Sequence, residues 1–254
     1  MTRLDKKLVD LNLARTRSQA QQLVKEGVVL VDKTICLKPS LRIENQEIEV
    51  SKKEIFVSRG AHKVEGALKE FEISVTDFIV ADVGASTGGF TNFVLSRGAK
   101  KVYAIDVGHG QLVSELLADK RVINMEGVNI RELNELPDMC DLAVVDLSFI
   151  SLRLCLENIF KLIKHDGRIV ALVKPQFEVG KDGLSKNGIV KNKDVVRNMI
   201  DELYDWCDEQ SMYISGFCLS PIKGKTGNQE FFFLFDKSLT KHSLTKNSIN
   251  IEDL

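Results

Sequence analysis

Short apolar runs alternate with segments of helical spacing over most of the chain. After residue 78 the runs predict strands at 79–83, 102–106, 122–125, 142–147 and 168–173. A helix is expected over 193–210, followed by two strands near 213–219 and 230–235 that a glycine loop joins as an antiparallel pair. Strands that alternate with helices in this way predict an α/β fold with a doubly wound, mostly parallel sheet.

The first fifty residues follow a different pattern. Apolar residues at 4, 8, 9 and 11 share one helical face, and Thr16 is a suitable N-cap for a second helix that ends at Gly27. Short strands then begin at Val28, and the segment is expected to form a minimal α+β domain. We therefore expect a small domain over 1–52, a linker over 53–62, a larger domain over 63–236 and a flexible tail over 237–254.

Composition adds a charge asymmetry to this picture. Residues 1–69 hold 14 Lys and Arg against 9 Asp and Glu, and the remainder holds 21 against 27. A basic front end is typical of polyanion binding, although uneven distribution of solvated charges is the alternative.

The five cysteines are dispersed and the four histidines have no ligand spacing, so we expect reduced thiols, no metal and a cytoplasmic protein. The polar first residues and the lack of a long apolar run predict no signal peptide and no membrane association.

The segment Asp82–Phe90 carries the strongest single signal. It follows an apolar run and contains three glycines before a helical pattern, which predicts a strand, a tight turn and a helix that cradle a nucleotide-like ligand. The spacing is neither Gly-x-Gly-x-x-Gly nor a P-loop. Asp106 ends the next apolar run, where a carboxylate suits a ribose diol. An adenosine-type cofactor without a pyrophosphate, such as S-adenosylmethionine, therefore fits better than NAD, and glycines at tight packing points are the alternative.

Charged residues also occur where the predicted sheet would collect them. Asp146 and Lys174 each follow a buried strand directly, Glu230 opens the last strand, and Lys63 lies on the helix that enters the larger domain. A charge at such a position is costly unless it is paired or has a function. The four side chains predict either a shared catalytic cleft or a structural ion-pair network.

The second N-terminal helix is rich in groups that donate to phosphates and sugars. These residues, together with Arg3, are candidates for RNA binding: Arg15, Arg17, Gln19, Gln22 and Lys25. A solvated helix face is the alternative. The order Arg3-Leu4-Asp5, residues 13–20 and residues 25–29 resembles the S4 RNA-binding module, with Lys33 in place of a common turn glycine.

The larger domain resembles another family. The segments 58–63, 82–90, 145–146, 173–174 and 228–230 occur in the order seen in FtsJ-type ribose 2'-O-methyltransferases. With the S4-like segment in front, the chain resembles the TlyA family, described as ribosomal RNA 2'-O-methyltransferases of cytidine and often labelled haemolysin. Further matches are Asp146–Ser151, Lys174–Glu178 and Ser220–Gly224. The resemblance implies a class I methyltransferase fold, ribosomal RNA or subunits as partner, and cytidine in large-subunit RNA as substrate, with small-subunit RNA as a second target.

The resemblance also implies a role for each candidate residue. Lys63, Asp146, Lys174 and Glu230 match a catalytic tetrad in which Lys174 holds the 2'-oxygen, Asp146 and Glu230 orient it, and Lys63 contacts the substrate. Whether Lys174 acts as a base or only orients stays open. The methionine end of S-adenosylmethionine would lie among Gly84, Ala85, Ser86, Gly88, Gly89 and Phe90, with Asp106 on the ribose and Val107 at the adenine. Asn129 either reaches the adenine or caps a turn, and Arg59 is a further RNA-binding candidate.

Three other functions stay open at this point. The chain could be an RNA-binding module with an inactive methyltransferase scaffold, although all four tetrad residues are present. It could methylate a small molecule, which would leave the S4-like segment without a purpose. It could also damage membranes, although it has neither a long apolar span nor a strongly amphipathic cationic helix.

Overall fold

The computed structural model describes residues 1–25, 27–50, 56–190 and 192–250, and the chain divides into two units at Phe56 and Val57. The sequence predicts a linker over 53–62. In the structure residues 57–62 belong to the second unit, because a helix that buries Ala61 already begins at Gly60. The part of the predicted linker at 53–55 lies outside the described residues.

The first unit is the predicted α+β domain. Its two helices are α1 (Leu4–Asp10) and α2 (Arg17–Lys25), and the hydroxyl of Thr16 accepts a hydrogen bond of 3.2 Å from the N–H of Gln19. Its strands form two small antiparallel sheets. The first pairs β1 (Thr2–Arg3) with β4 (Arg42–Ile43), and the second pairs β2 (Val29–Val31) with β3 (Thr34–Ile35) and β5 (Ile48–Val50). The apolar faces of the helices and strands meet in one core.

The second unit is built on the predicted seven-stranded sheet. Its strands are β6 (Ile79–Val83), β7 (Lys101–Asp106), β8 (Val122–Glu126), β9 (Cys140–Val145), β10 (Ile163–Val173), β11 (Ile214–Leu219) and β12 (Phe231–Asp236). They lie in the order β11-β12-β10-β9-β6-β7-β8, and β12 is antiparallel to both of its neighbours. The α/β prediction and the antiparallel final pair are both confirmed.

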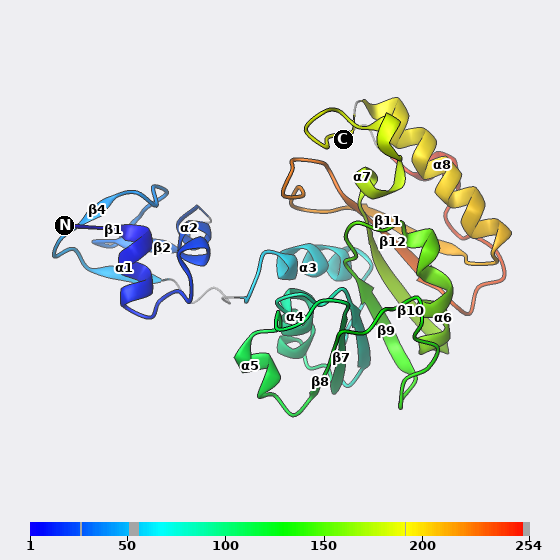
Figure 1. Cartoon of the computed structure of the whole chain (residues 1–254), viewed down its shortest axis with the longest axis horizontal. Helices are drawn as coiled ribbons and strands as arrows, with labels where there is room; N and C mark the ends of the chain where they lie inside the picture. Colours follow the sequence, from blue (N-terminus) through cyan, green and yellow to red (C-terminus); the bar gives the residue numbers. More distant parts are fainter. Residues whose placement is uncertain (26, 51–55, 191, 251–254) are drawn as a thin grey trace. The chain divides into compact units, whose positions relative to one another are not determined.

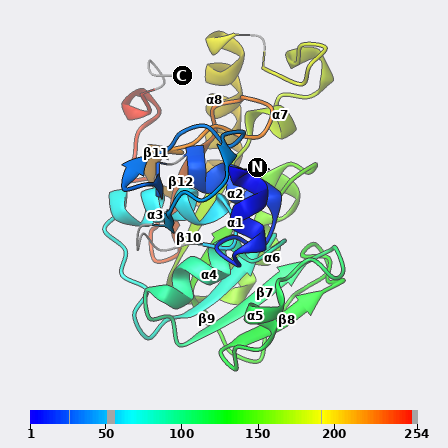
Figure 2. The ribbon, with the colours of Figure 1, turned by 90° about the vertical axis from the view of Figure 1, so that its left-hand side faces the viewer.

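Helices cover both faces of this sheet, as Figure 1 shows. One face carries α3 (Gly60–Glu70), α4 (Gly89–Ser96) and α5 (Ser114–Leu117), which lie in front of the strands in Figure 2. The other face carries α6 (Leu156–Leu162) and α8 (Lys193–Glu209), while the short α7 (Pro175–Glu178) follows β10 directly. The central strands are buried on both faces, which explains their nearly uniform apolar sequences.

The strand order determines where a site can form. β6 lies between β7 and β9, so the chain leaves β6 toward one edge of the sheet and later returns to its other side. In open parallel sheets, ligands bind outside the carboxyl ends of the strands at such a switch point. The glycine loop follows β6, and Asp146 follows β9, so both predicted motifs lie at this point.

The C-terminal segment differs from the predicted flexible tail. Ile249 is fully buried, and its carbonyl accepts a hydrogen bond of 2.7 Å from Arg197 on α8. The hydroxyl of Tyr204 donates to the carbonyl of Leu244 at 2.8 Å. Residues 237–250 are therefore corrected to a packed segment, because isolated apolar residues among the polar ones contact the α8 side of the core. Residues 251–254 lie outside the described part of the chain.

Candidate active site

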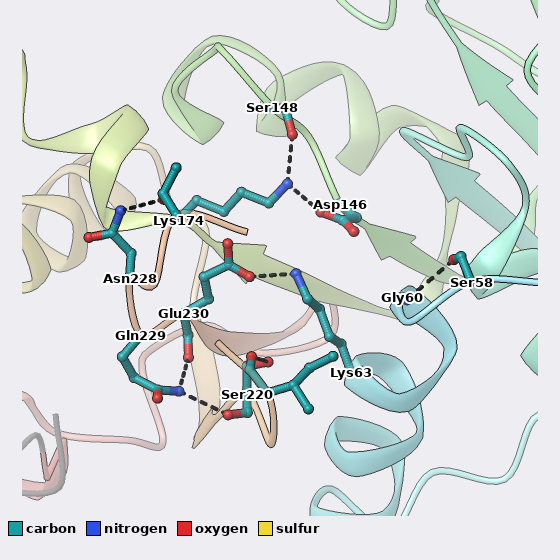
Figure 3. A network of polar contacts seen from close by, with 12 residues as sticks. Ser58, Gly60, Lys63, Asp146, Ser148, Lys174, Ser220, Asn228, Gln229 and Glu230 are labelled. Atoms are coloured by element: carbon teal, nitrogen blue, oxygen red, sulfur yellow. Dashed lines mark hydrogen bonds and ion pairs between the residues drawn. The ribbon is translucent and has the colours of Figure 1, made fainter. Parts of the chain in front are cut away.

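Four charged side chains from separate segments meet at the carboxyl edge of the sheet (Figure 3). Lys63 projects from α3 and places its Nζ 2.5 Å from Oε2 of Glu230, which directly precedes β12. Lys174 follows β10 and places its Nζ 2.5 Å from Oδ1 of Asp146, which follows β9. Both lysines and Glu230 are buried. The structure therefore brings together all four residues of the predicted tetrad as two ion pairs.

The pairing differs from the prediction in one respect. The family resemblance implies that Asp146 and Glu230 both orient Lys174, whereas Glu230 forms its ion pair with Lys63. Lys174 has a second partner that the sequence did not predict, the hydroxyl of Ser148, which accepts a hydrogen bond of 2.7 Å from Nζ. An ammonium group has three N–H donors. Asp146 and Ser148 engage two at most, so one donor can serve an incoming oxygen.

Glu230 is held from the opposite side by backbone and amide contacts. Its carbonyl accepts hydrogen bonds of 2.9 Å from the N–H of Ser220 and from the side-chain amide of Gln229, which also donates to the carbonyl of Ser220. These contacts join the end of β11 to the start of β12 (Figure 3). The carboxylate is therefore held at a defined position opposite α3.

The glycine loop lies directly against the tetrad. Gly84 has a φ of +88°, and a Cβ added to it would lie 2.6 Å from the carbonyl oxygen of Asp146. The N–H of Asp146 donates in turn to the carbonyl of Val83 at 2.9 Å. A side chain at position 84 would therefore displace the backbone that carries Asp146. The remaining predicted loop residues lie in the same turn and in the first residues of α4: Ala85, Ser86, Gly88, Gly89 and Phe90.

Asp82, beneath this loop, was not among the predicted site residues. Its Oδ2 accepts hydrogen bonds from the N–H and the hydroxyl of Thr91, at 2.8 and 2.6 Å. Its Oδ1 is buried and has no hydrogen-bonding partner in the described part of the chain. Burial raises the pKa of Asp82 to about 7, against the hydrogen bonds from Thr91, which lower it. A buried carboxylate oxygen without a partner fits the cationic amine at the methionine end of S-adenosylmethionine.

The predicted ribose and adenine contacts lie one strand further along. The carboxylate of Asp106 accepts hydrogen bonds from the N–H of Ser86 at 2.8 Å and of Gly108 at 2.7 Å, which fix it at the tip of β7. Each of its oxygens has a second lone pair that a ribose hydroxyl can use. Val107 is 70% exposed beside it. Asn129 accepts from the N–H of Arg131 at 3.2 Å, which is the predicted turn cap, and its adenine contact stays a prediction.

An exposed aromatic residue beside Lys174 was also missed. Phe149 is 90% exposed and has a φ of +66°, which is uncommon for a bulky residue. Its ring centroid lies 5.1 Å from that of Phe177, whose ring is 6.0 Å from Nζ of Lys174. Glu178 holds this loop in place by accepting hydrogen bonds from the hydroxyl of Ser151 and the N–H of Leu152. The available signal was a phenylalanine three residues after the tetrad acid.

The predicted RNA-binding residues of the first unit divide into two groups. Arg3 and Arg17 converge on the buried carboxylate of Asp5, at 2.9 and 3.0 Å, so part of their charge serves the fold of the unit. The others surround the start and exposed face of α2, with Arg15 and Lys25 exposed and Gln19 and Gln22 half-buried. In the second unit Arg59 is exposed next to the start of α3. RNA binding by all of these residues stays a prediction.

The fold and the site together define a class I methyltransferase. The sheet order, the glycine loop at the switch point and the Lys63, Asp146, Lys174 and Glu230 tetrad are the defining features. The chain matches the FtsJ-like methyltransferase family over residues 56–237 and the S4 domain family over residues 2–47. The chain belongs to the TlyA family of FtsJ-like methyltransferases with an N-terminal S4 domain. This membership implies S-adenosylmethionine as the methyl donor.

Similar proteins cover nearly the whole chain. The 16S/23S rRNA (cytidine-2'-O)-methyltransferase TlyA of Mycobacterium tuberculosis is 38% identical over 252 residues, which is 97% of this chain and 94% of that protein. Hemolysin A of Brachyspira hyodysenteriae is 38% identical, over 92% of this chain and 99% of that protein. A solved structure from Streptococcus thermophilus, described as a presumed hemolysin, is 37% identical with a TM-score of 0.73, over 96% of this chain and 91% of that one.

Among the described residues, none of the helices is both long enough and apolar enough to cross a membrane. The same residues contain no group of three or more His, Cys, Asp or Glu side chains that could hold a metal ion.

Proposed function

We propose that this protein transfers a methyl group from S-adenosylmethionine to the ribose 2'-oxygen of a cytidine in ribosomal RNA. Large-subunit RNA is the primary substrate and small-subunit RNA a second target, and the enzyme acts on ribosomes in the cytoplasm. The observation that carries the proposal is the tetrad, in which Lys174 keeps a donor for the acceptor oxygen while Asp146 and Ser148 hold its other side. The names of relatives such as the Mycobacterium tuberculosis TlyA protein support the same substrate.

The residues around the switch point fit the cofactor. Asp82 Oδ1 would accept from its amino group, Gly84 to Phe90 would surround the methionine end, and Asp106 would accept from the ribose hydroxyls beside Val107. When bound, S-adenosylmethionine supplies a methyl group activated by a positively charged sulfonium. An inactive scaffold would not need the buried, partly unpartnered carboxylate that this chain keeps beneath the loop.

The tetrad can compensate for the low reactivity of the acceptor hydroxyl. A ribose hydroxyl is a weak nucleophile because it is almost fully protonated near neutral pH. Lys174 would hold the 2'-oxygen by its remaining N–H and stabilise the negative charge that develops there, while Asp146 and Ser148 fix the direction of Nζ and the hydroxyl proton passes to water. Assisted proton transfer contributes about 10²–10⁴-fold to such reactions, so the alignment of the acceptor must supply much of the rest.

The first unit would bind RNA by its basic helix. Arg15 and Lys25 are exposed there, and such groups bind phosphates without reading sequence. The choice of nucleotide would then depend on the surroundings of Lys174, where Phe149 offers an exposed ring for a base.

The decisive experiment is methylation of isolated ribosomal subunits by the purified protein, with ribose methylation mapped by mass spectrometry. Wild type should modify a cytidine, and Lys174→Ala should lose at least about 10³-fold in rate, since orientation and charge stabilisation are both removed. Calorimetric titration should give the same cofactor affinity for both proteins. Lys120→Ala is the control, because Lys120 is exposed just before β8 at the opposite edge of the sheet. No new ribose methyl group in either subunit with wild type would overturn the proposal.

A further inference from the structure

A cavity of about 220 Å³ is lined by residues that neighbour two members of the tetrad in the sequence. Its walls include Pro175, which follows Lys174, and Gln229, which precedes Glu230. The remaining walls come from the segment between α7 and α8, from α8 itself and from the loop before β12, and include Ile189, Val190, Lys193 and Lys223. We call this cavity the flanking pocket.

The flanking pocket is preformed by buried hydrogen bonds. Asn228 is 4% exposed, and its side-chain amide donates to the carbonyl of Gly188 at 2.9 Å while its oxygen accepts from the N–H of Val190 at 3.0 Å. A β-bridge between Leu184 and Val190 closes the same segment into a short hairpin. Asn228 thereby joins the wall that carries Ile189 to the segment that carries Glu230, directly before β12. The flanking pocket and the tetrad are consequently held in a fixed relation.

The chemistry of the walls combines an apolar surface with positive charge. Pro175 and Val190 offer apolar contact, and Ile189 is 40% exposed. Lys193 and Lys223 are both exposed, and none of the described residues that line the cavity is acidic. The volume is below the roughly 300–1,000 Å³ of pockets that enclose a whole drug-sized ligand. A single base with its phosphate matches this size, this apolar surface and this charge.

We propose that the flanking pocket binds the RNA nucleotide next to the methylated one, with its base against Ile189 and Val190 and its phosphate at Lys223. This inference rests on the proposed function, because it requires the acceptor ribose at Lys174 and places the neighbouring nucleotide beside Pro175, the next residue of the chain. The pocket would select the sequence or shape around the target, while the tetrad performs the transfer.

The test pairs two protein variants with altered RNA. Lys223→Gln should raise KM for an RNA substrate about three- to tenfold with kcat within about twofold, and should reduce the salt dependence of binding by about one phosphate contact. Removing the base on one side of the target should lower kcat/KM of wild type about fivefold or more. Ile189→Ala should lower kcat/KM for intact RNA to the same extent. With the abasic RNA its kcat/KM should fall no further, because the contact between the base and the side chain is already absent. Substrates abasic on the 5' or the 3' side identify which neighbour is bound.

Lys120→Gln is the matched control and should leave KM, kcat and the salt dependence unchanged. The proposal for the flanking pocket would be overturned by two results together. These are an equal fall in kcat/KM of wild type and of Ile189→Ala on both abasic substrates, and an unchanged KM for Lys223→Gln, in a preparation whose wild type still methylates RNA. Absence of wild-type methylation would instead overturn the proposed function, so the two failures are distinguishable.

Discussion

The ion pair between Lys63 and Glu230 gives the sharpest test of how the site is built. Their side chains are 11% and 3% exposed, and the charged atoms lie 2.5 Å apart. At an effective dielectric constant of about 20, the attraction is about 7 kcal/mol before desolvation is subtracted. Desolvation offsets most of that gain, so the intact pair contributes little net stability. Removing one partner is different, because the other charge stays buried and unpaired.

Glu230→Gln keeps the shape of the side chain and removes its charge. We expect it to lower the free energy of unfolding of the second unit by about 3–5 kcal/mol, and Lys63→Met to cost a similar amount. The double variant removes both charges together, so it should recover at least about 2 kcal/mol of the summed loss. Methyl transfer should stay impaired in all three proteins, because recovery of stability does not restore the tetrad.

Urea unfolding can be followed in the second unit alone. Trp206 is the only tryptophan of the chain, and it lies on α8 against the core of that unit. Its fluorescence gives the free energy of unfolding for wild type, both single variants and the double variant. Additive losses in this cycle would refute the reasoning, since they would mean that the two charges do not depend on each other.

Three further predictions follow from buried or exposed groups. Because burial raises the pKa of Asp82 to about 7, cofactor affinity should rise with pH below that value and level off above it, and Asp82→Asn should abolish the rise in calorimetric titrations. Phe149→Ala should lower kcat/KM for RNA about tenfold in methylation assays without changing cofactor affinity or stability, because the ring is 90% exposed. Hydrogen bonds from Arg3, Gln21 and Arg17 hold the pKa of Asp5 well below its usual range. Asp5 therefore stabilises the first unit above its unfolded pKa of about 3.9, and this stability is lost as pH falls, which amide hydrogen exchange at β2 should show and Asp5→Asn should remove.

The sheet of the second unit was predictable because burial on both faces makes a parallel strand uniformly apolar. The main error in strand length is at β10, which begins at Ile163 and not at residue 168. The intervening segment Lys164–Arg168 is polar, and the pairing with β9 shifts register there. A strand interrupted by such an irregularity has no apolar pattern to detect.

The positions of the tetrad were predictable, but its pairing was not. A charge directly after a buried strand is visible in sequence, which identified Asp146 and Lys174. The partner of Glu230 depends on how close α3 comes to the start of β12, and Lys63 and Glu230 are 167 residues apart in the chain. Asp82 was missed for a related reason, because its partner Thr91 and its unpartnered oxygen become apparent only when α4 is placed over β6.

The glycines of the loop also leave room for the segments that carry two tetrad residues. Gly84 leaves room for the backbone of Asp146, and a Cβ on Gly89 would collide with the hydroxyl of Ser58 just before α3, the helix that carries Lys63. The backbone of Asp146 therefore rests on the loop that is expected to hold the cofactor, and the helix that carries Lys63 begins against the same loop. A shift of the loop would press on Asp146 and on the start of that helix, because the contacts are too close to absorb it.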